Sequence, residues 1–219
     1  MSSNVILENI DIELNHFNNI YPDIHANQAI QYFTAETFQT QFQNLKPCDL
    51  SVIHLNIRSI YANGSVFCSY LETLKSKFDV ICLSETWNNN SPIIDHFFPS
   101  YIGFHSSRPE GTRGGGVSIF VSKRFSYVEL LDLSSDSEAM ECIFVRFIRS
   151  NISINIDCIY RPPQNNHDDF TSQFEDKLRA LSLCSSTCIV CGHFNYGLFK
   201  TSDDNKSSNF QYTANSLLR

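Results

Sequence analysis

The chain has 219 residues and a formal net charge of −7, with 42% hydrophobic and 18% charged residues. These proportions predict a mostly globular chain, long enough for one α/β domain with an additional N-terminal segment. They disfavour a protein whose main task is to coat nucleic acid, because affinity for phosphate backbones comes chiefly from Lys and Arg. A nuclease that uses local positive charge and a bound cation is not excluded.

The first 47 residues are predicted to form a poorly ordered N-terminal arm, followed by a domain over residues 48–219. The arm is rich in Asn, Gln, Asp and Thr, and its apolar residues show little periodicity apart from a short helix expected near Thr34–Phe42. We expect the arm to make few contacts with the core. Docking by isolated aromatic anchors is the open alternative, with Tyr21, Tyr32, Phe33, Phe38 and Phe42 as candidates.

The domain begins with a strand, a helix and a second strand. Residues 50–55 are an apolar run that ends on Asn56, and residues 78–83 are another that ends on Ser84-Glu85. Between them, apolar residues recur at spacings of four, three and four, as on one face of an amphipathic helix. This strand–helix–strand order favours parallel pairing in a sheet with helices outside it.

Further strands and one more helix are predicted downstream. Three glycines open a strand over residues 117–121, which a basic turn follows; residues 140–148 and 152–160 form a hairpin. An apolar stripe over residues 170–181 predicts a second helix, and residues 187–191 predict a last strand.

The eight cysteines do not indicate disulfides or a metal centre. Five of them lie in apolar runs, where a cysteine usually acts as a small buried hydrophobe: Cys82, Cys142, Cys158, Cys188 and Cys191. Cys188 and Cys191 form a C-x-x-C, but no second pair follows at zinc-ligand spacing, so buried strand positions are favoured over a metal or redox site.

No membrane span, signal peptide or obligate protein partner is indicated. No apolar run approaches the length of a span, and the N-terminus lacks the basic and apolar regions of a signal peptide. The sequence therefore predicts an intracellular, reduced and soluble protein, nuclear if it is part of an active retroelement.

Polar residues able to handle a metal or a phosphate follow the predicted strands. They are Asn56, Glu85, Tyr160 and the pair His193 and Asn195. Ligands of α/β sheets bind where strands end, because the loops there converge, and Mg²⁺ prefers oxygen donors such as a carboxylate. Any one of these residues alone is more often a turn former. Their joint occurrence in this order favours a site.

Five strings carry a family resemblance. They are His54-Leu55-Asn56-Ile57-Arg58-Ser59, Leu83-Ser84-Glu85-Thr86-Trp87, Gly114-Gly115-Gly116-Val117, Tyr160-Arg161-Pro162-Pro163 and Cys191-Gly192-His193-Phe194-Asn195. Together they resemble the endonuclease domain of non-LTR retrotransposons, within the endonuclease/exonuclease/phosphatase superfamily that includes AP endonucleases and deoxyribonuclease I. The resemblance runs from about residue 49 onward and implies a two-sheet α/β sandwich with helices on the outer faces.

The resemblance implies a role for each residue in Mg²⁺-dependent hydrolysis of a DNA phosphodiester. Glu85 would be the main Mg²⁺ ligand, with Asn56 beside it orienting the site, and Mn²⁺ could replace Mg²⁺. Tyr160 would hydrogen-bond the scissile phosphate, and Asn195 would stabilise charge in the transition state. Weak binding of DNA is expected. Candidate phosphate contacts are Arg58, Arg108, Arg113, Lys123 and Arg124, with ordinary solvated turn charges as the alternative.

Two departures from the family pattern predict impaired activity. The family has Asp at the position of His193, where the carboxylate accepts a proton from the attacking water or orients it; losing a positioned base costs about 10²–10⁴-fold in rate. The family's C-terminal Ser-Asp-His string is absent, which implies missing last strands and predicts that His193→Asp alone does not fully restore activity. Two other functions stay open: a non-catalytic retroelement remnant, and a phosphatase acting on small phosphorylated molecules.

Overall fold

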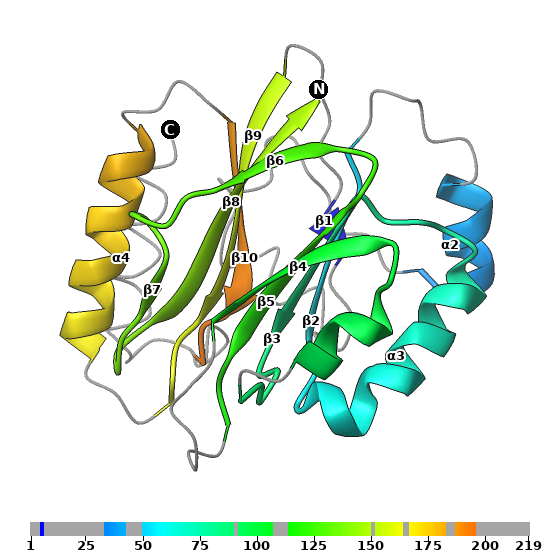
Figure 1. Ribbon diagram of the computed structural model, residues 1–219, viewed down its shortest axis with the longest axis horizontal. Coiled ribbons are helices and arrows are strands. Elements are labelled where there is room, and N and C mark those ends of the chain that lie inside the picture. The colour runs from blue at the N-terminus through cyan, green and yellow to red at the C-terminus, as the bar shows by residue number, and fades with distance from the viewer. Residues whose placement is uncertain are drawn as a thin grey trace, which may run out of the picture.

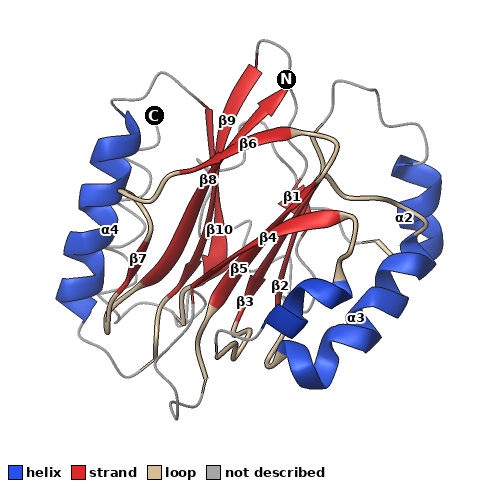
Figure 2. Ribbon diagram, in the orientation of Figure 1, coloured by secondary structure: helices blue, strands red, loops and turns tan. Residues whose placement is uncertain are grey.

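Two five-stranded β-sheets face each other in the computed structural model, and helices cover their outer faces (Figures 1 and 2). Helix α4 lies on one outer face, and helices α2 and α3 lie on the other. This arrangement confirms the predicted two-sheet α/β sandwich. The structure describes residues 5–6, 33–42, 50–89, 92–106, 114–149, 152–163, 167–182 and 187–195.

The first sheet contains the predicted strand–helix–strand unit. Its strand order is β1-β2-β3-β5-β4, in which β1, β2 and β3 are parallel and β5 is antiparallel to both β3 and β4. Helix α3 connects β2 to β3 and is capped at its N-terminus by Ser59, whose side chain accepts a hydrogen bond from Ala62 N. The elements on this side are β1 (Val5–Ile6), α2 (Ala35–Phe42), β2 (Val52–Asn56), α3 (Ile60–Leu74), β3 (Val80–Ser84), η2 (Pro92–Phe97), β4 (Tyr101–Ser106) and β5 (Val117–Ser122).

The second sheet is built on the predicted hairpin. Its order is β10-β9-β8-β6, with β7 paired to β8, and α4 connects β9 to the parallel strand β10. The elements on this side are β6 (Ser126–Glu129), β7 (Ser135–Asp136), β8 (Glu141–Arg149), β9 (Ile152–Tyr160), α4 (His167–Ser182) and β10 (Thr187–His193).

Side chains alternate between the two faces of each strand, so the second sheet separates two apolar layers. On β9, Ile156 and Cys158 face the first sheet, while Ile159 faces α4. A third apolar layer lies between the first sheet and helices α2 and α3.

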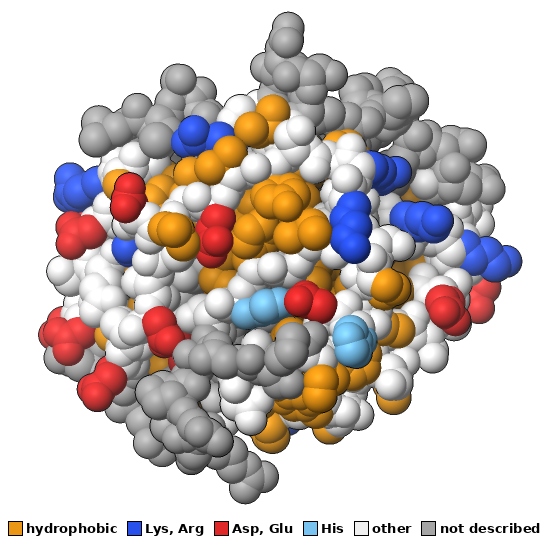
Figure 3. All heavy atoms as spheres, viewed as in Figure 1, with side chains coloured by type: hydrophobic (Ala, Val, Ile, Leu, Met, Phe, Trp, Pro, Cys, Tyr) orange, Lys and Arg blue, Asp and Glu red, His pale blue; other side chains and the backbone are white. Residues whose placement is uncertain are grey.

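The short strands β1, β4, β6 and β7 were not predicted from the sequence. All four residues of β6 are exposed, so the strand has no buried face to create an alternating pattern. Figure 3 shows hydrophobic side chains gathered on the face that β4 and β6 cross. There the ring of Tyr127 on β6 packs edge-on against Phe104 on β4, with centroids 5.2 Å apart.

The described part of the N-terminal arm packs against the core. Helix α2 coincides with the predicted short helix, and Phe38 is only 4% exposed, with its ring 6.1 Å from that of Phe78. Phe33 and Phe42 pack beside Phe38. The alternative of aromatic anchoring therefore applies to residues 33–42, where the expectation of few core contacts is wrong; the boundary near residue 47 stays a prediction.

Within the part of the chain that the structure describes, no helix combines the length and apolar character needed to cross a membrane.

Candidate active site

Strands from both sheets end at one edge of the sandwich, the lower edge in Figure 1, called here the rim. In the first sheet Asn56 is the register partner of Ser84, the residue before Glu85. In the second sheet His193 is the register partner of Tyr160. The strand ends therefore bring together the four predicted positions Asn56, Glu85, Tyr160 and His193, with Asn195 just beyond β10.

Residues from both sheets approach the carboxylate of Glu85. Asn56 Nδ2 donates a hydrogen bond of 2.9 Å to Glu85 Oε1, and His193 Nε2 from the other sheet lies 3.8 Å from the same oxygen. Asn56 Oδ1 accepts a hydrogen bond of 3.3 Å from the backbone of Arg58. Asn56 therefore fixes the orientation of the carboxylate, whose side chain stays 16% exposed.

His193, Tyr160 and Asn195 form the opposite wall of the rim. The imidazole stacks on the Tyr160 ring with a centroid separation of 6.1 Å, and its Nε2 lies 2.9 Å from Asn195 Oδ1. Asn195 Nδ2 in turn donates a 2.6 Å hydrogen bond to the backbone oxygen of Arg161. Because an amide oxygen only accepts hydrogen bonds, His193 Nε2 is the donor in its contact with Asn195.

Arg161, which the sequence analysis did not select, organises this wall. Its backbone N–H donates to His193 O at 3.0 Å, and its guanidinium lies 3.4 Å from the carbonyl oxygens of Phe194 and Asn195. The side chain is nearly buried. Arg161 therefore positions Asn195 from beneath, and only the folded contacts reveal this role.

The rim concentrates unusual backbone geometry. Five non-glycine residues there have positive φ: Arg58 (45°), Ser59 (80°), Glu85 (53°), Trp87 (54°) and Asn195 (51°). Left-handed conformations cost non-glycine residues about 1–3 kcal/mol each and persist where surrounding contacts impose them. Some of these residues hold one another in place, because the backbone N–H of Ser59 donates a hydrogen bond of 2.8 Å to Glu85 O.

The triple-glycine string contacts the residues that follow Glu85. Gly116 has φ +83°, and a Cβ atom at this position would lie 2.6 Å from Thr86 Oγ1, so glycine is required for the close approach. Gly116 O accepts a hydrogen bond from Thr86 N, and Gly116 N donates to the carboxylate of Glu141. Glu141 is fully buried at the start of β8, and the sequence analysis missed it; its sequence signal is an acidic residue opening an apolar strand.

His54 lies one layer below the rim and was also not selected as a functional residue. Its Nε2 is 3.2 Å from Ser84 Oγ. Burial, with a further contribution from the nearby charge of His193, lowers the pKa of His54 to about 4. The His54 ring is therefore neutral at physiological pH and adds no charge beneath Glu85.

Lys123 and Arg124, two of the candidate phosphate contacts, do not lie at the rim. Strand β5 is antiparallel to β3, with Val117 opposite Ser84 and Val121 opposite Val80, so the turn after β5 lies at the other end of the sheet. There Lys123 Nζ donates to Pro99 O at 2.8 Å, and Arg124 pairs with Asp79. Arg58 is exposed beside Asn56, and Arg108 and Arg113 lie outside the described residues.

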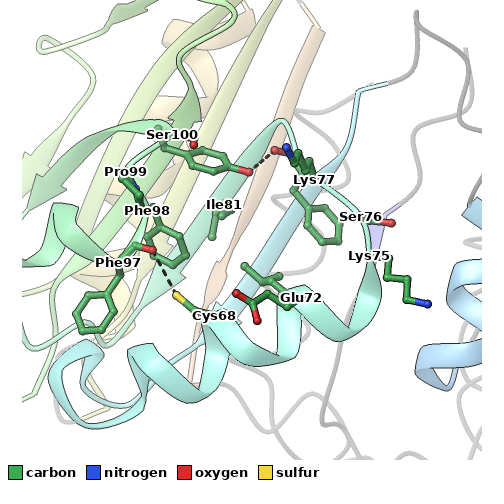
Figure 4. A pocket seen from close by; sticks show the side chains of 13 residues that line it. Cys68, Glu72, Lys75, Ser76, Lys77, Ile81, Phe97, Phe98, Pro99 and Ser100 are labelled. Carbon is green, nitrogen blue, oxygen red and sulfur yellow. Dashed lines mark hydrogen bonds between the residues drawn. The ribbon is translucent and has the colours of Figure 1, made fainter.

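A cavity of about 340 Å³ also lies at this far end, between α3, η2 and the start of β4 (Figure 4). Two polar groups on its wall already have partners. Tyr101 Oη donates to Phe78 O at 2.7 Å, and Cys68 Sγ lies 3.4 Å from Phe97 O. The exposed surface of the cavity is mainly apolar, although Glu72, Lys75 and Lys77 also line it.

The residues at the rim fit a hard divalent cation. The partly exposed carboxylate of Glu85 is the kind of oxygen donor that Mg²⁺ or Mn²⁺ accepts. Asn56 contacts this carboxylate through Nδ2, and its amide oxygen accepts from the backbone N–H of Arg58. His193 is not a suitable ligand for Mg²⁺ or Mn²⁺, because a hard cation prefers oxygen and because a protonated imidazole would repel it.

Comparisons with known proteins agree with this geometry. Residues 53–213 match the model of the Endonuclease/Exonuclease/phosphatase family. A search of curated protein sequences returns no match.

Solved structures share the fold at low sequence identity. The endonuclease domain of TRAS1, a telomere-specific non-LTR retrotransposon, has a TM-score of 0.57 at 14% identity, covering 77% of this chain and 72% of that chain. Truncated Caenorhabditis elegans TDP2 has a TM-score of 0.52 at 17% identity, covering 73% and 68%. The mannosyl-6-phosphatase Bt3783 of Bacteroides thetaiotaomicron has a TM-score of 0.51 at 15% identity, covering 74% and 70%.

Proposed function

Since this chain belongs to the Endonuclease/Exonuclease/phosphatase family, we propose that its rim is a phosphodiester-hydrolysis site of the retrotransposon endonuclease type, in which His193 impairs turnover. The observation that carries the proposal is the meeting of Asn56, Glu85, Tyr160, His193 and Asn195 at one edge of the sandwich, with Asn56 hydrogen-bonded to Glu85. The TRAS1 domain, which has the same fold, supports DNA as the substrate.

Each residue has a task that its position allows. Glu85 would hold a divalent cation, with the amide of Asn56 keeping its carboxylate turned toward the rim. When bound, the cation would neutralise phosphate oxygens that gain charge in the transition state. Tyr160 would donate its hydroxyl to a phosphate oxygen, while the exposed Arg58 would contact the DNA backbone.

His193 impairs this site for two physical reasons. First, its Nε2 donates to Asn195 Oδ1, so this nitrogen is not available to accept a proton from an attacking water. Second, the imidazole lies 3.8 Å from the carboxylate that would bind the cation. When protonated it forms an ion pair with Glu85 and competes with the cation, whereas a carboxylate at the same position would attract it.

A phosphatase acting on small phosphorylated molecules is the second candidate. Two observations favour it: the similarity to the mannosyl-6-phosphatase fold, and the distance of Lys123 and Arg124 from the rim, which reduces the positive surface available to a long DNA backbone. The non-catalytic remnant remains the third candidate. It keeps the fold and the cation site without turnover.

Cleavage of supercoiled plasmid by the purified 219-residue chain tests the proposal. With Mg²⁺ or Mn²⁺ we expect slow nicking at most, and none from Glu85→Ala. Release of phosphate from a sugar phosphate, without nicking, would instead support the phosphatase. Rapid nicking that Glu85→Ala abolishes would show that His193 acts as an effective base and would refute the impairment.

A further inference from the structure

A cluster of cysteine thiols lies directly beneath the rim, between the two sheets. On β2 and β3, His54 and Cys82 are register partners, one layer inside Asn56 and Ser84. On β9 and β10, Cys158 and Cys191 are register partners, one layer inside Tyr160 and His193. The layer below the candidate active site therefore contains three thiols and one imidazole, beside apolar side chains of the neighbouring strands such as Ile119 and Ile143.

The three thiols are close enough to share one ligand. The Sγ atoms of Cys82, Cys158 and Cys191 all lie within 4.8 Å of one another. Cys82 and Cys158 are buried, and Cys191 is partly buried. Three sulfurs bound tetrahedrally to one zinc ion, at about 2.3 Å each, are about 3.8 Å apart. Small side-chain rotations are enough to bring the cluster to that spacing.

We propose that Cys82, Cys158 and Cys191 bind a thiophilic d¹⁰ cation, Zn²⁺ or Cu⁺, that links the two sheets beneath the rim. Thiolate sulfur selects these ions over Mg²⁺ and Ca²⁺, which prefer oxygen. Each thiol that binds the metal releases its proton to solvent, so three thiolates and Zn²⁺ carry a net charge of −1. This site is separate from the oxygen-donor site at Glu85.

His54 would become a fourth ligand only after its ring rotates away from Ser84 Oγ, because its nitrogens do not belong to the group of ligand atoms within 4.8 Å of one another. It neighbours Cys82 across the parallel strands, on the same face of the sheet, and its ring lies beside Ser84. Three cysteines and one histidine form one of the common tetrahedral zinc donor sets. With His54 bound, the site would be closed, as in structural zinc centres. Without it, three sulfurs would suit Cu⁺.

The C-x-x-C string does not form this site. Cys188 and Cys191 are three residues apart on β10, and an odd separation on a strand directs side chains to opposite faces. Cys188 packs in the layer against α4, whereas Cys191 packs in the layer between the sheets. Cys188 is therefore a matched control, because it lies on the same strand but faces away from the cluster.

Cadmium titration of the metal-free chain tests the proposal, since cadmium thiolates have a charge-transfer absorption in the ultraviolet that oxygen ligands lack. We expect one equivalent of Cd²⁺ to produce this absorption and to replace Zn²⁺ in a chain loaded with zinc, because thiolate sulfur favours the softer ion. The absorption should be lost in Cys82→Ala, Cys158→Ala and Cys191→Ala. It should persist in Cys188→Ala, and also in Glu85→Gln, which removes the oxygen-donor site.

A second measurement does not depend on the folding of the alanine variants. Bound metal should protect Cys82, Cys158 and Cys191 of the unmodified chain from a thiol-alkylating reagent in mild denaturant, while Cys188 and Cys142 react as without metal. His54→Gln should weaken zinc binding if zinc has four ligands, and leave Cu⁺ binding unchanged. Absence of the absorption in the folded chain, its loss in Cys188→Ala, or protection that does not distinguish the three cysteines would each overturn the proposal.

Discussion

The two ends of the first sheet carry similar polar residues but use them differently. At the far end, where β3 begins, Asp79 is 3% exposed and accepts hydrogen bonds from Ser51 N and Ser51 Oγ, and it also pairs with Arg124. At the rim, where β3 ends, Glu85 has one amide donor and keeps part of its carboxylate open to solvent. A carboxylate at a strand end is therefore not evidence of function by itself.

Backbone geometry separates the two ends as clearly as the side chains do. The rim contains positive φ values at Glu85, Trp87 and Asn195, together with Arg58 and Ser59. At the far end, among the described residues, the positive φ belongs to Lys75, which ends α3 in a left-handed conformation whose N–H bonds to Glu72 O. That is an ordinary way to end a helix, often with glycine in this position. At the rim Ser59 caps the start of α3, but Arg58, Glu85, Trp87 and Asn195 lie in loops and end no helix, so their backbone strain favours a functional role for the rim.

The largest expected effect comes from His193→Asp at the rim. A carboxylate at this position would supply a base and attract the cation, so we expect Mg²⁺-dependent nicking to increase by about 10²-fold, the lower end of the contribution of a general base. Full recovery is not expected, because Asn195 Nδ2 is held by Arg161 O. Initial rates of plasmid nicking measure the effect, with His193→Asn as the matched uncharged control. Equal rates for both variants would contradict this explanation.

The next effect is on stability at the far end. Asp79→Ala leaves Ser51 N and Ser51 Oγ without their acceptor, and we expect it to lower the free energy of unfolding by about 2–3 kcal/mol. The pair with Arg124 adds little because the guanidinium is 56% exposed. Urea denaturation measures the change. Glu175→Ala, which breaks an exposed pair with Arg179 on α4, should cost less than about 0.5 kcal/mol. A similar loss in both variants would argue against the far end as a structural network.

A smaller effect, on the salt dependence of DNA binding, distinguishes Arg58 at the rim from Lys123 at the far end. Arg58→Ala should reduce the magnitude of the salt dependence by about 0.9, the value for one phosphate contact. Lys123→Ala should leave it unchanged, because Lys123 lies at the far end and bonds Pro99 O. Fluorescence anisotropy with a short duplex over a range of salt concentrations checks this. If Lys123→Ala reduced the salt dependence of DNA binding and Arg58→Ala did not, DNA would bind at the far end of the sheet and the prediction would be wrong.

The smallest expected effect is on the pH dependence of stability and concerns His105 on β4. Like Asp79, His105 is bonded to side chains of the protein itself. Burial lowers the pKa of His105, partly offset by Asp95, which lies 3.1 Å away, and by Glu129. The unfolded chain therefore binds the proton at a higher pH than the folded chain does. The stability associated with His105 is present above the unfolded pKa of about 6.5 and is lost as the pH falls below it. His105→Gln should flatten the stability profile in that window, whereas an unchanged profile would contradict the assignment.

The candidate site was largely predictable because its members end strands. Asn56, Glu85, Tyr160 and His193 each close an apolar run, and the strands carrying them are joined by helices or pair in register. These residues converge because the strands that carry them run in the same direction and end at the same edge of the sandwich. Their chemical roles stay predictions.

The errors share one cause, which is that the partners of a residue lie far from it in the chain. Lys123 and Arg124 were chosen as candidate phosphate contacts, but β5 runs away from the rim and the turn after it lies at the other end of the sheet. Glu141 was missed because its partner, Gly116, lies on the other sheet. The docking of Phe38 on the core stayed an open alternative because its partner Phe78 is forty residues away.

The sequence by itself determined the elements whose apolar residues recur with the period of a strand or a helix. These are the parallel strands β2 and β3 and the helix α3 that connects them, the β8–β9 hairpin, helix α4 and strand β10. Their periodic apolar residues must be buried, and burial requires these elements. Only the tertiary structure decided which sheet edge each element occupies, which end of the sandwich each turn reaches, and that Cys82, Cys158 and Cys191 meet beneath Glu85. The reason is physical: alternation fixes the face of a strand on which a side chain lies, but the residue opposite that face belongs to a different sheet and a distant part of the chain.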